Sequence, residues 1–178
     1  MAAGAVGEGL LLNPKGIIAV EIMLITSFMV FLGAVVFFII VKNQVREKYS
    51  EAKSELNLLN SIAKDARNIT GKTIREITLN DCSACICKDD LRNISSTKSC
   101  FLNWSNALGY LKNHAGVQNI DELWRDPWGS PYLLDENERE GGPSDCRSDT
   151  ITTAGADGIY GTGDDIGLLI PLYISSCP

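Results

Sequence analysis

The sequence predicts an α+β fold: one long N-terminal helix, transmembrane at first and amphipathic afterwards, packed on a small antiparallel sheet. Three observations lead to this class. They are an unbroken apolar stretch, a helix-period apolar stripe that follows it, and short alternating segments between turn residues near the C-terminus. A length of 178 residues is enough for one domain plus an extension.

The apolar stretch covers residues 17–41 and contains a single charged side chain, whereas the sequence after Lys42 has the composition of a soluble domain. As a helix it would rise about 37 Å, more than the roughly 30 Å of a bilayer's hydrocarbon core. A buried core helix is the alternative, but so small a domain could not enclose this stretch. We therefore expect residues 17–41 to span a membrane or to form the core of an assembly.

A second apolar pattern continues the helix through residues 42–69. Its members recur every three or four positions: Val45, Tyr49, Ala52, Leu56, Leu59, Ala63 and Ala66. Leu58 and Ile62 widen this stripe, and charged residues occupy the opposite face. Because no glycine or proline interrupts it, the helix should continue to about Asn68. We expect this half to pack under a globular head, residues 70–178, since a free coiled coil of three heptads is marginal.

Within the head, the sequence predicts one further helix and three strands. The helix covers residues 102–113 and places Trp104, Leu108 and Leu111 on one face. The strands cover residues 132–134, 150–153 and 168–175, with a turn at Gly141-Gly142 between the first two and Pro171 indicating an edge or a bulge in the last. The turn-rich residues 70–100 are expected to form an irregular connector.

Six cysteines follow the apolar stretch: Cys82, Cys85, Cys87, Cys100, Cys146 and Cys177. An even number outside a membrane anchor indicates disulfides and an oxidising compartment. We expect a Cys146–Cys177 pair that closes a C-terminal loop, while spacing leaves the pairing of the other four open. Clustered thiolates could bind a metal instead, but this cluster has no matching second pair, and His114 is not spaced to help.

Composition argues against two classes of function. The chain has 22 acidic and 16 basic residues and a net charge of −6, without a cluster of lysines and arginines. No nucleic-acid-binding groove is therefore expected. The chain has one histidine, and no nucleophile elbow, phosphate loop or metal-hydrolase motif is recognisable. We expect that the protein is not an enzyme.

The first 16 residues end in Lys15-Gly16, and Glu21 lies just inside the apolar stretch. A secretory signal would place its cleavage site after the apolar stretch instead. A carboxylate in a spanning helix costs several kcal/mol, so Glu21 should have a partner or a purpose. The arrangement resembles the class III leader of type IV pilins and type II secretion pseudopilins. This resemblance implies that prepilin peptidase cuts between Gly16 and Ile17, and that Glu21 meets the new α-amine of a neighbouring subunit during assembly.

A second motif lies in the glycine-rich residues 153–166, where Asp157, Asp164 and Asp165 would repel one another without a cation. Oxygen ligands on a flexible loop suit calcium, although the spacing is not that of an EF-hand. A solvated turn with incidental acids is the alternative.

With Asp-Pro-Trp-Gly-Ser-Pro-Tyr at residues 126–132, this stretch looks like the C-terminal part of the major pseudopilin of type II secretion. The resemblance implies a pilin-like fold and a calcium ion. Its ligands would be the side chains of Asp157, Asp164 and Asp165 and the backbone carbonyls of Ala154 and Thr162. The cysteines depart from the family's pattern.

The resemblance as a whole implies a structural subunit of an extracytoplasmic type IV pilus or pseudopilus, a helical homo-oligomer. An assembly platform would take the subunit from the cytoplasmic membrane into a cell-surface or periplasmic filament. A minor tip or adhesin subunit and a non-polymerising, membrane-tethered calcium-binding domain are the alternatives. Lys42, Arg46 and Lys48 follow the span, and alone would place the head inside the cell. The cysteines and the leader place it outside.

Overall fold

The computed structural model describes the backbone of residues 14–118 and 120–173, and the side chains of residues 22–118, 120 and 122–173. By its internal contacts the chain divides into two compact units, Met1–Val45 and Arg46–Pro178. The second unit is α+β, as the sequence predicts, and contains the sheet, the shorter helices and the C-terminal part of the long helix.

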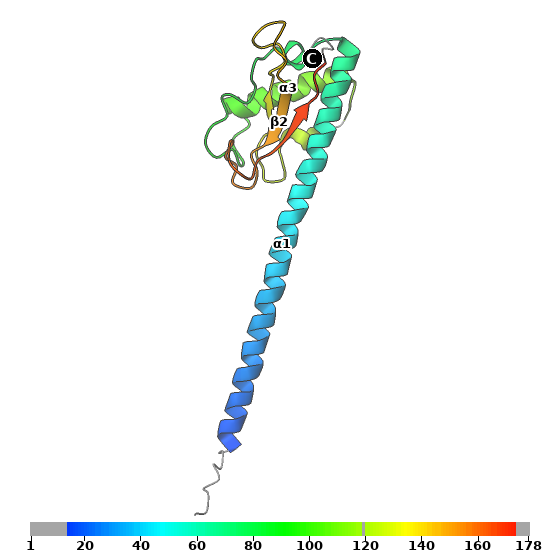
Figure 1. Cartoon of the computed structure of the whole chain (residues 1–178). Coiled ribbons are helices and arrows are strands. Elements are labelled where there is room, and N and C mark those ends of the chain that lie inside the picture. The colour runs from blue at the N-terminus through cyan, green and yellow to red at the C-terminus, as the bar shows by residue number, and fades with distance from the viewer. Residues whose placement is uncertain (1–13, 119, 174–178) are drawn as a thin grey trace, which may run out of the picture. The chain divides into compact units, whose positions relative to one another are not determined.

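The long helix α1 (Pro14–Thr70) forms as predicted and runs without a break through Gly33 (Figure 1). It ends where Gly71 adopts a left-handed conformation with φ 69°. There the Gly71 N–H donates to the carbonyl oxygen of Arg67 at 2.8 Å. Glycine at this position ends a helix at low conformational cost. Among the described residues, α1 contains the one stretch long and apolar enough to span a membrane.

The sheet has three antiparallel strands in the order β1 (Leu133–Asp135), β2 (Asp149–Thr153) and β3 (Ile166–Ile170). Ile151, at the centre of β2, pairs with Leu134 on one side and Leu168 on the other. The sequence prediction placed the third strand at residues 168–175, two residues too late at its start. The observed strand β3 ends before Pro171, because proline has no N–H to donate to the ladder.

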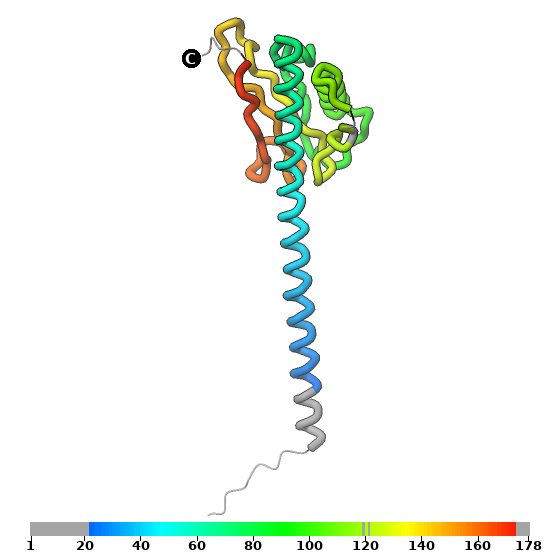
Figure 2. Tube along the Cα trace, turned by 90° about the vertical axis from the view of Figure 1, so that its right-hand side faces the viewer, coloured from blue at the N-terminus to red at the C-terminus, as the bar shows by residue number. Residues whose placement is uncertain are grey.

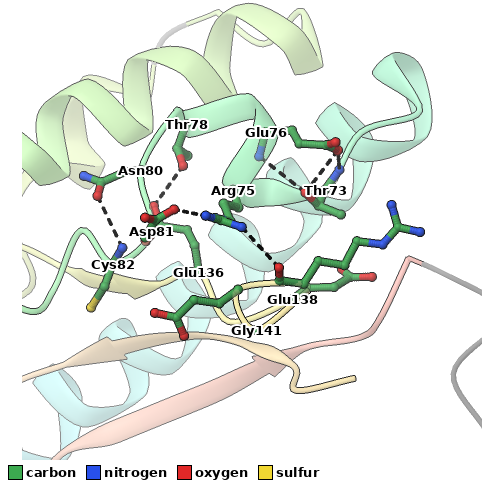
Figure 3. Close-up of polar contacts among 12 residues, drawn as sticks. Thr73, Arg75, Glu76, Thr78, Asn80, Asp81, Cys82, Glu136, Glu138 and Gly141 are labelled. Atoms are coloured by element: carbon green, nitrogen blue, oxygen red, sulfur yellow. Dashed lines mark hydrogen bonds and ion pairs between the residues drawn. The ribbon is translucent and has the colours of Figure 1, made fainter. Parts of the chain in front are cut away.

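Two shorter α-helices and the 3-10 helix η1 (Asp121–Trp124) belong to the head. Helix α3 (Ser99–Ala115) extends the predicted helix at both ends and stops at Gly116, whose φ is 68°. The sequence prediction of an irregular connector misses α2 (Ile74–Thr78). This helix begins with a capping box, in which the Thr73 hydroxyl accepts from the Glu76 N–H while the Glu76 carboxylate accepts from the Thr73 N–H (Figure 3). The Thr-x-x-Glu pattern was the available signal.

The core of the second unit forms where the C-terminal part of α1 packs with the sheet and with α3. In the view of Figure 2 the sheet appears on one side of this part of α1 and α3 on the other. Leu56, Leu59 and Ala63 are 0% exposed, and Ile62 is also buried. They pack with side chains from α3, from all three strands and from Tyr132 just before β1: Trp104, Leu108, Leu111, Tyr132, Leu134, Ile151 and Ile170.

The predicted stripe fails at two positions. Leu58 is 48% exposed, because it lies about 100° around the helix from Leu59. Val45 is 47% exposed, so continuous burial starts only after it, with the half-buried Tyr49 and the fully buried Ala52.

Candidate functional site

Three positions singled out by the sequence lie near the start of α1. The backbone of Gly16, Ile17 and Glu21 is helical, and their side chains are outside the described residues. Cleavage between Gly16 and Ile17 and an assembly role for Glu21 therefore stay predictions.

Residues 22–41, the apolar segment, form the largest exposed apolar surface of the described chain. Every large apolar side chain from Ile22 to Val41 is at least 39% exposed. The Thr26 hydroxyl points back to the helix and donates to the carbonyl oxygen of Ile22 at 2.9 Å. The carbonyl oxygen of Met23 is a second acceptor for this hydroxyl, at 3.0 Å. This hydroxyl therefore brings no unpaired donor into an apolar environment. The surface suits lipid or apolar side chains of other molecules.

The second candidate is the acidic loop, residues 153–166, between β2 and β3. The Asp164 Oδ2 accepts a hydrogen bond from the Asp157 N–H at 3.0 Å, and its Oδ1 accepts from the Thr162 hydroxyl at 2.7 Å. That hydroxyl also lies 3.3 Å from the Asp157 Oδ1. Asp165 makes a separate contact, accepting from the Gly161 N–H at 2.7 Å. Thus Asp157 and Asp164 share the Thr162 hydroxyl, whereas backbone N–H groups hold the Asp165 carboxylate.

A glycine is required at residue 155. Its φ is +64°, and a Cβ there would lie 2.5 Å from the Asp164 carbonyl oxygen and 2.6 Å from its Oδ2. Any side chain would push Asp164 out of the loop. Gly155 thereby allows Asp164 to lie against the backbone that follows β2.

Residues 90–92 hold the other side of the loop, and sequence reasoning missed them. The Leu91 N–H donates to the Gly158 carbonyl oxygen at 2.8 Å, and the Arg92 guanidinium donates to the Ala156 carbonyl oxygen at 3.2 Å. Arg92 also pairs with Asp90, which lowers the pKa of that carboxyl to about 2. These residues precede the loop by more than sixty positions, and no local pattern connects them to it.

The pKa values of Asp164 and Asp165 are shifted in opposite directions. Hydrogen bonds from Thr162 and from the backbone N–H of Asp157 hold the pKa of Asp164 below its usual range. Partial burial, and then the charges of Asp164 and Asp157, raise the pKa of Asp165. The Asp165 Oδ1 is also buried and has no hydrogen-bond partner among the described residues. A cation beside Asp165 would offset the repulsion among the carboxylates and would give the unpaired Asp165 Oδ1 a partner.

The donor set fits a hard cation, because the side chains of Asp157, Asp164 and Asp165 and the carbonyls of Ala154 and Thr162 all offer oxygen. The three carboxylates are not gathered tightly, however. Among the described residues, only Cys82, Cys85 and Asp135 bring three ligand atoms within 4.8 Å of one another. Calcium would therefore have to draw the loop's carboxylates closer, and the site stays a prediction.

Residues 126–132 anchor the acidic loop to the rest of the head. The Asp126 Oδ1 accepts from the backbone N–H groups of Trp128 and Ser130, both at 2.9 Å. Its Oδ2 accepts the hydroxyl of Thr153, the first residue of the loop. Asp126 is 4% exposed, and this burial raises its pKa. One carboxylate thus closes the turn of the motif and fixes where the loop begins.

The aromatic residues of the same motif contact α1. The Trp128 ring packs edge-on against Tyr49 with 5.0 Å between centroids. The buried Tyr132 donates its hydroxyl to Glu55 and packs against Trp104 of α3. The motif therefore has a packing function in this fold.

A buried ionic cluster at the end of α1 was also missed. Arg67, Glu138 and Asp149 are each at most 3% exposed. The Arg67 guanidinium donates to the Glu138 carboxylate at 3.3 Å, and the Glu138 N–H donates to the Asp149 Oδ1 at 2.8 Å. The Tyr173 N–H donates to Glu138 at 3.1 Å. Charged residues are expected at the surface, so sequence gave no reason to place these inside.

The cysteine pairing that spacing left open is now defined for four residues. Cys82 pairs with Cys85 and Cys87 with Cys100, which confirms disulfides at these positions. Cys146 is also disulfide-bonded, and its predicted partner, Cys177, lies outside the described residues.

A scan against protein-family models, a search of curated proteins and a search of solved structures each found no match for this chain.

Proposed function

We propose that the chain is a structural subunit of an extracytoplasmic filament of the type IV pilus or pseudopilus kind. In this role the apolar segment lies in the membrane before assembly and bundles with copies of itself afterwards. The observation that carries the proposal is the exposure of every large apolar side chain from Ile22 to Val41 on a helix that continues without a break to Thr70.

The energetics of the apolar segment support this proposal. Burying one large aliphatic or aromatic side chain stabilises a protein by about 1.5–3 kcal/mol, so a whole segment cannot remain in water. A bilayer satisfies this requirement for a single chain, and a bundle of identical helices satisfies it for an assembly. A pilin-like subunit would occupy these two environments in turn, the bilayer before assembly and the helix bundle after it.

The leader pattern supports processing and assembly. Prepilin peptidase would cut between Gly16 and Ile17, and the assembly platform would then place Glu21 near the Ile17 α-amine of a neighbour. The disulfides Cys82–Cys85 and Cys87–Cys100 support an extracytoplasmic head, because they persist in oxidising compartments.

A second candidate, a membrane-tethered calcium-binding domain that does not polymerise, is favoured by the unpaired Asp165 Oδ1 in the acidic loop. The two candidates differ in what they require of Glu21, because a simple anchor has no use for a carboxylate near the start of its span. Calcium stabilisation of the head is compatible with both.

The variant Glu21→Ala separates them. Membrane insertion should be intact or improved, the head should melt at the wild-type temperature, and filaments should be lost or form slowly. Glu47→Ala is the matched control, because Glu47 lies exposed on the same helix beyond the apolar segment. Normal filaments from Glu21→Ala would show that Glu21 has no role in assembly. That result would favour the second candidate, the membrane-tethered calcium-binding domain.

A further inference from the structure

The two disulfides between residues 82 and 100 differ in their accessibility. Cys87 and Cys100 are each 6% exposed, and their bond closes a loop with a sequence separation of 13. Cys85 is exposed and Cys82 half-buried, and their separation is only 3. A small reductant therefore reaches the Cys82–Cys85 bond first, and opening so short a loop releases less chain entropy.

The segment that carries this bond is held by other contacts. Ser83 and Ala84 are each 2% exposed. The Ser83 N–H and hydroxyl donate to the buried Glu136 carboxylate at 2.7 and 2.6 Å, and the Ala84 N–H donates to the Leu134 carbonyl oxygen at 2.9 Å.

Further contacts lie on the side that precedes the disulfide. The Asn80 side chain accepts from the Cys82 N–H at 3.3 Å, and the Thr78 hydroxyl donates to Glu136 at 2.9 Å (Figure 3). Opening the disulfide should therefore leave both sulfurs close to their present positions.

Asp135 supplies a third donor at the same place. It is the last residue of β1 and half-buried, and its carboxylate and the sulfurs of Cys82 and Cys85 all lie within 4.8 Å of one another. Two sulfurs and one carboxylate oxygen on a fixed scaffold form a partial coordination shell, with one position open to water.

We propose that the reduced pair Cys82 and Cys85, together with Asp135, binds a thiophilic divalent cation of the zinc type. In an oxidising compartment the two sulfurs stay bonded to each other. The site forms once a dithiol reductant gives them two electrons and two protons and itself becomes a disulfide. The cation then displaces one proton from each thiol, so binding releases two protons. The bound state has two thiolates and one carboxylate around a 2+ ion.

Geometry and charge favour this class of cation. In a tetrahedral site with zinc–sulfur bonds of about 2.3 Å, the two sulfurs are separated by about 3.8 Å. Small side-chain rotations bring the sulfurs from their bonded distance to this separation. Calcium and magnesium prefer oxygen donors and should bind here only weakly. Without a cation, the Asp135 charge disfavours a neighbouring thiolate, which argues against a thiol–disulfide exchange catalyst.

The test uses the full chain in detergent, with limited dithiol treatment followed by anaerobic removal of the dithiol. Mass spectrometry after alkylation should show Cys82 and Cys85 labelled while Cys87 and Cys100 stay bonded. Titration with Co²⁺ should give thiolate-to-cobalt charge-transfer absorption that saturates at one equivalent, and Zn²⁺ should displace the cobalt with no further net proton release. The oxidised protein should show neither signal.

Three variants define the ligands. The double variant Cys82→Ser with Cys85→Ser should lose the absorption while keeping the Cys87–Cys100 bond. Asp135→Asn should weaken Zn²⁺ binding at least tenfold. Asp81→Asn is the matched control: it removes one carboxylate next to Cys82 in sequence, and that carboxylate pairs with Arg75. Its Zn²⁺ affinity should stay within twofold of the wild type.

Several results would overturn the proposal. They are equal or faster reduction of Cys87–Cys100, loss of the native tryptophan fluorescence on reduction of Cys82–Cys85 alone, and cobalt absorption that persists in the double variant. Equal weakening by Asp135→Asn and Asp81→Asn would show a general charge effect, and no ligand role for Asp135. None of these readouts depends on filament formation, so the test is independent of the proposed function.

Discussion

The two parts of α1 are both rich in apolar residues, yet their surroundings are opposite. Residues 22–41 expose every large apolar side chain, whereas Ala52, Leu56 and Leu59 are 0% exposed. A helix that is apolar on all sides requires an apolar environment on all sides, but a helix with one apolar stripe requires only one partner surface. The second part therefore stabilises the head within its own chain, and the first requires other molecules. Substitutions in one part should leave the other unaffected.

The largest effect on the head should come from Leu59→Ala. Leu59 is 0% exposed in the core, and replacing a buried leucine with alanine costs about 2–5 kcal/mol. Denaturant unfolding of the full chain in detergent measures this loss. All three tryptophans (Trp104, Trp124 and Trp128) lie in the second unit, so their fluorescence reports on the head alone.

Leu58→Ala is the control for that measurement. Leu58 is 48% exposed on the same helix, and its loss should change the unfolding free energy by no more than about 0.5 kcal/mol. Equal destabilisation by the two variants would mean that the buried stripe is wrongly assigned.

A charge in the first part should have a large effect of a different kind. Val30 is 73% exposed near the middle of the apolar segment, and an aspartate there opposes membrane insertion by about 2.5–3.5 kcal/mol. Val30→Asp should reduce the membrane-bound fraction in cell fractionation and leave the unfolding curve of the head unchanged. A destabilised head with normal insertion would reverse the assignment of the two parts.

The buried cluster at the end of α1 should make stability depend on pH. Burial raises the pKa of Asp149 from 3.8 to about 6, against smaller opposing contributions from the backbone N–H of Glu138 and the charge of Arg67. Because the folded pKa lies above the unfolded one, the protein should lose stability as pH rises from about 4 to 6, by at most about 3 kcal/mol for this group.

Asp149→Asn isolates this contribution. The difference in unfolding free energy between wild type and variant should change by up to about 3 kcal/mol between pH 3.5 and 7, in favour of the variant at pH 7. A pH-independent difference would show that Asp149 titrates alike in the folded and unfolded states.

Calcium should have a smaller effect than the core, membrane and pH changes above. At one hundred times its Kd, a ligand that binds only the folded state stabilises it by about 2.7 kcal/mol, so the melting temperature of the head should rise. Asp165→Asn should lose most of this response and be no less stable in chelator, because burial and neighbouring charges already disfavour the ionised form. Asp89→Asn, an exposed change outside the loop, should keep the full response. An unchanged wild-type curve would mean that the loop is only a turn.

The sequence was sufficient for features set by local periodicity. The long helix, the buried face of α3 and the pairing of Leu133–Asp135 with Asp149–Thr153 follow from spacings of three to four and of two residues. Helix α2 was missed although its Thr73–Glu76 capping box was readable, because the cysteines and turn formers around it outweighed a single motif.

The candidate site was only partly predictable. The acidic residues of the loop are local, and their positions could be read from the sequence. Their supports are not local: Asp126 fixes Thr153, and Arg92 holds Ala156 across 64 positions. Glu138 and Asp149 are buried because they pack around Arg67 in the folded chain. No periodic pattern in the sequence predicts this packing. Long-range polar contacts of this kind require the fold to be known.

The central claim is that residues 17–41 form the core of a filament of identical subunits. Electron cryomicroscopy of purified surface filaments, combined with N-terminal sequencing of their main protein, tests it most directly. The account predicts chains that start at Ile17, with residues 17–41 bundled inside and the heads outside. A protein that keeps Met1 and is recovered only as single membrane-bound subunits would contradict it.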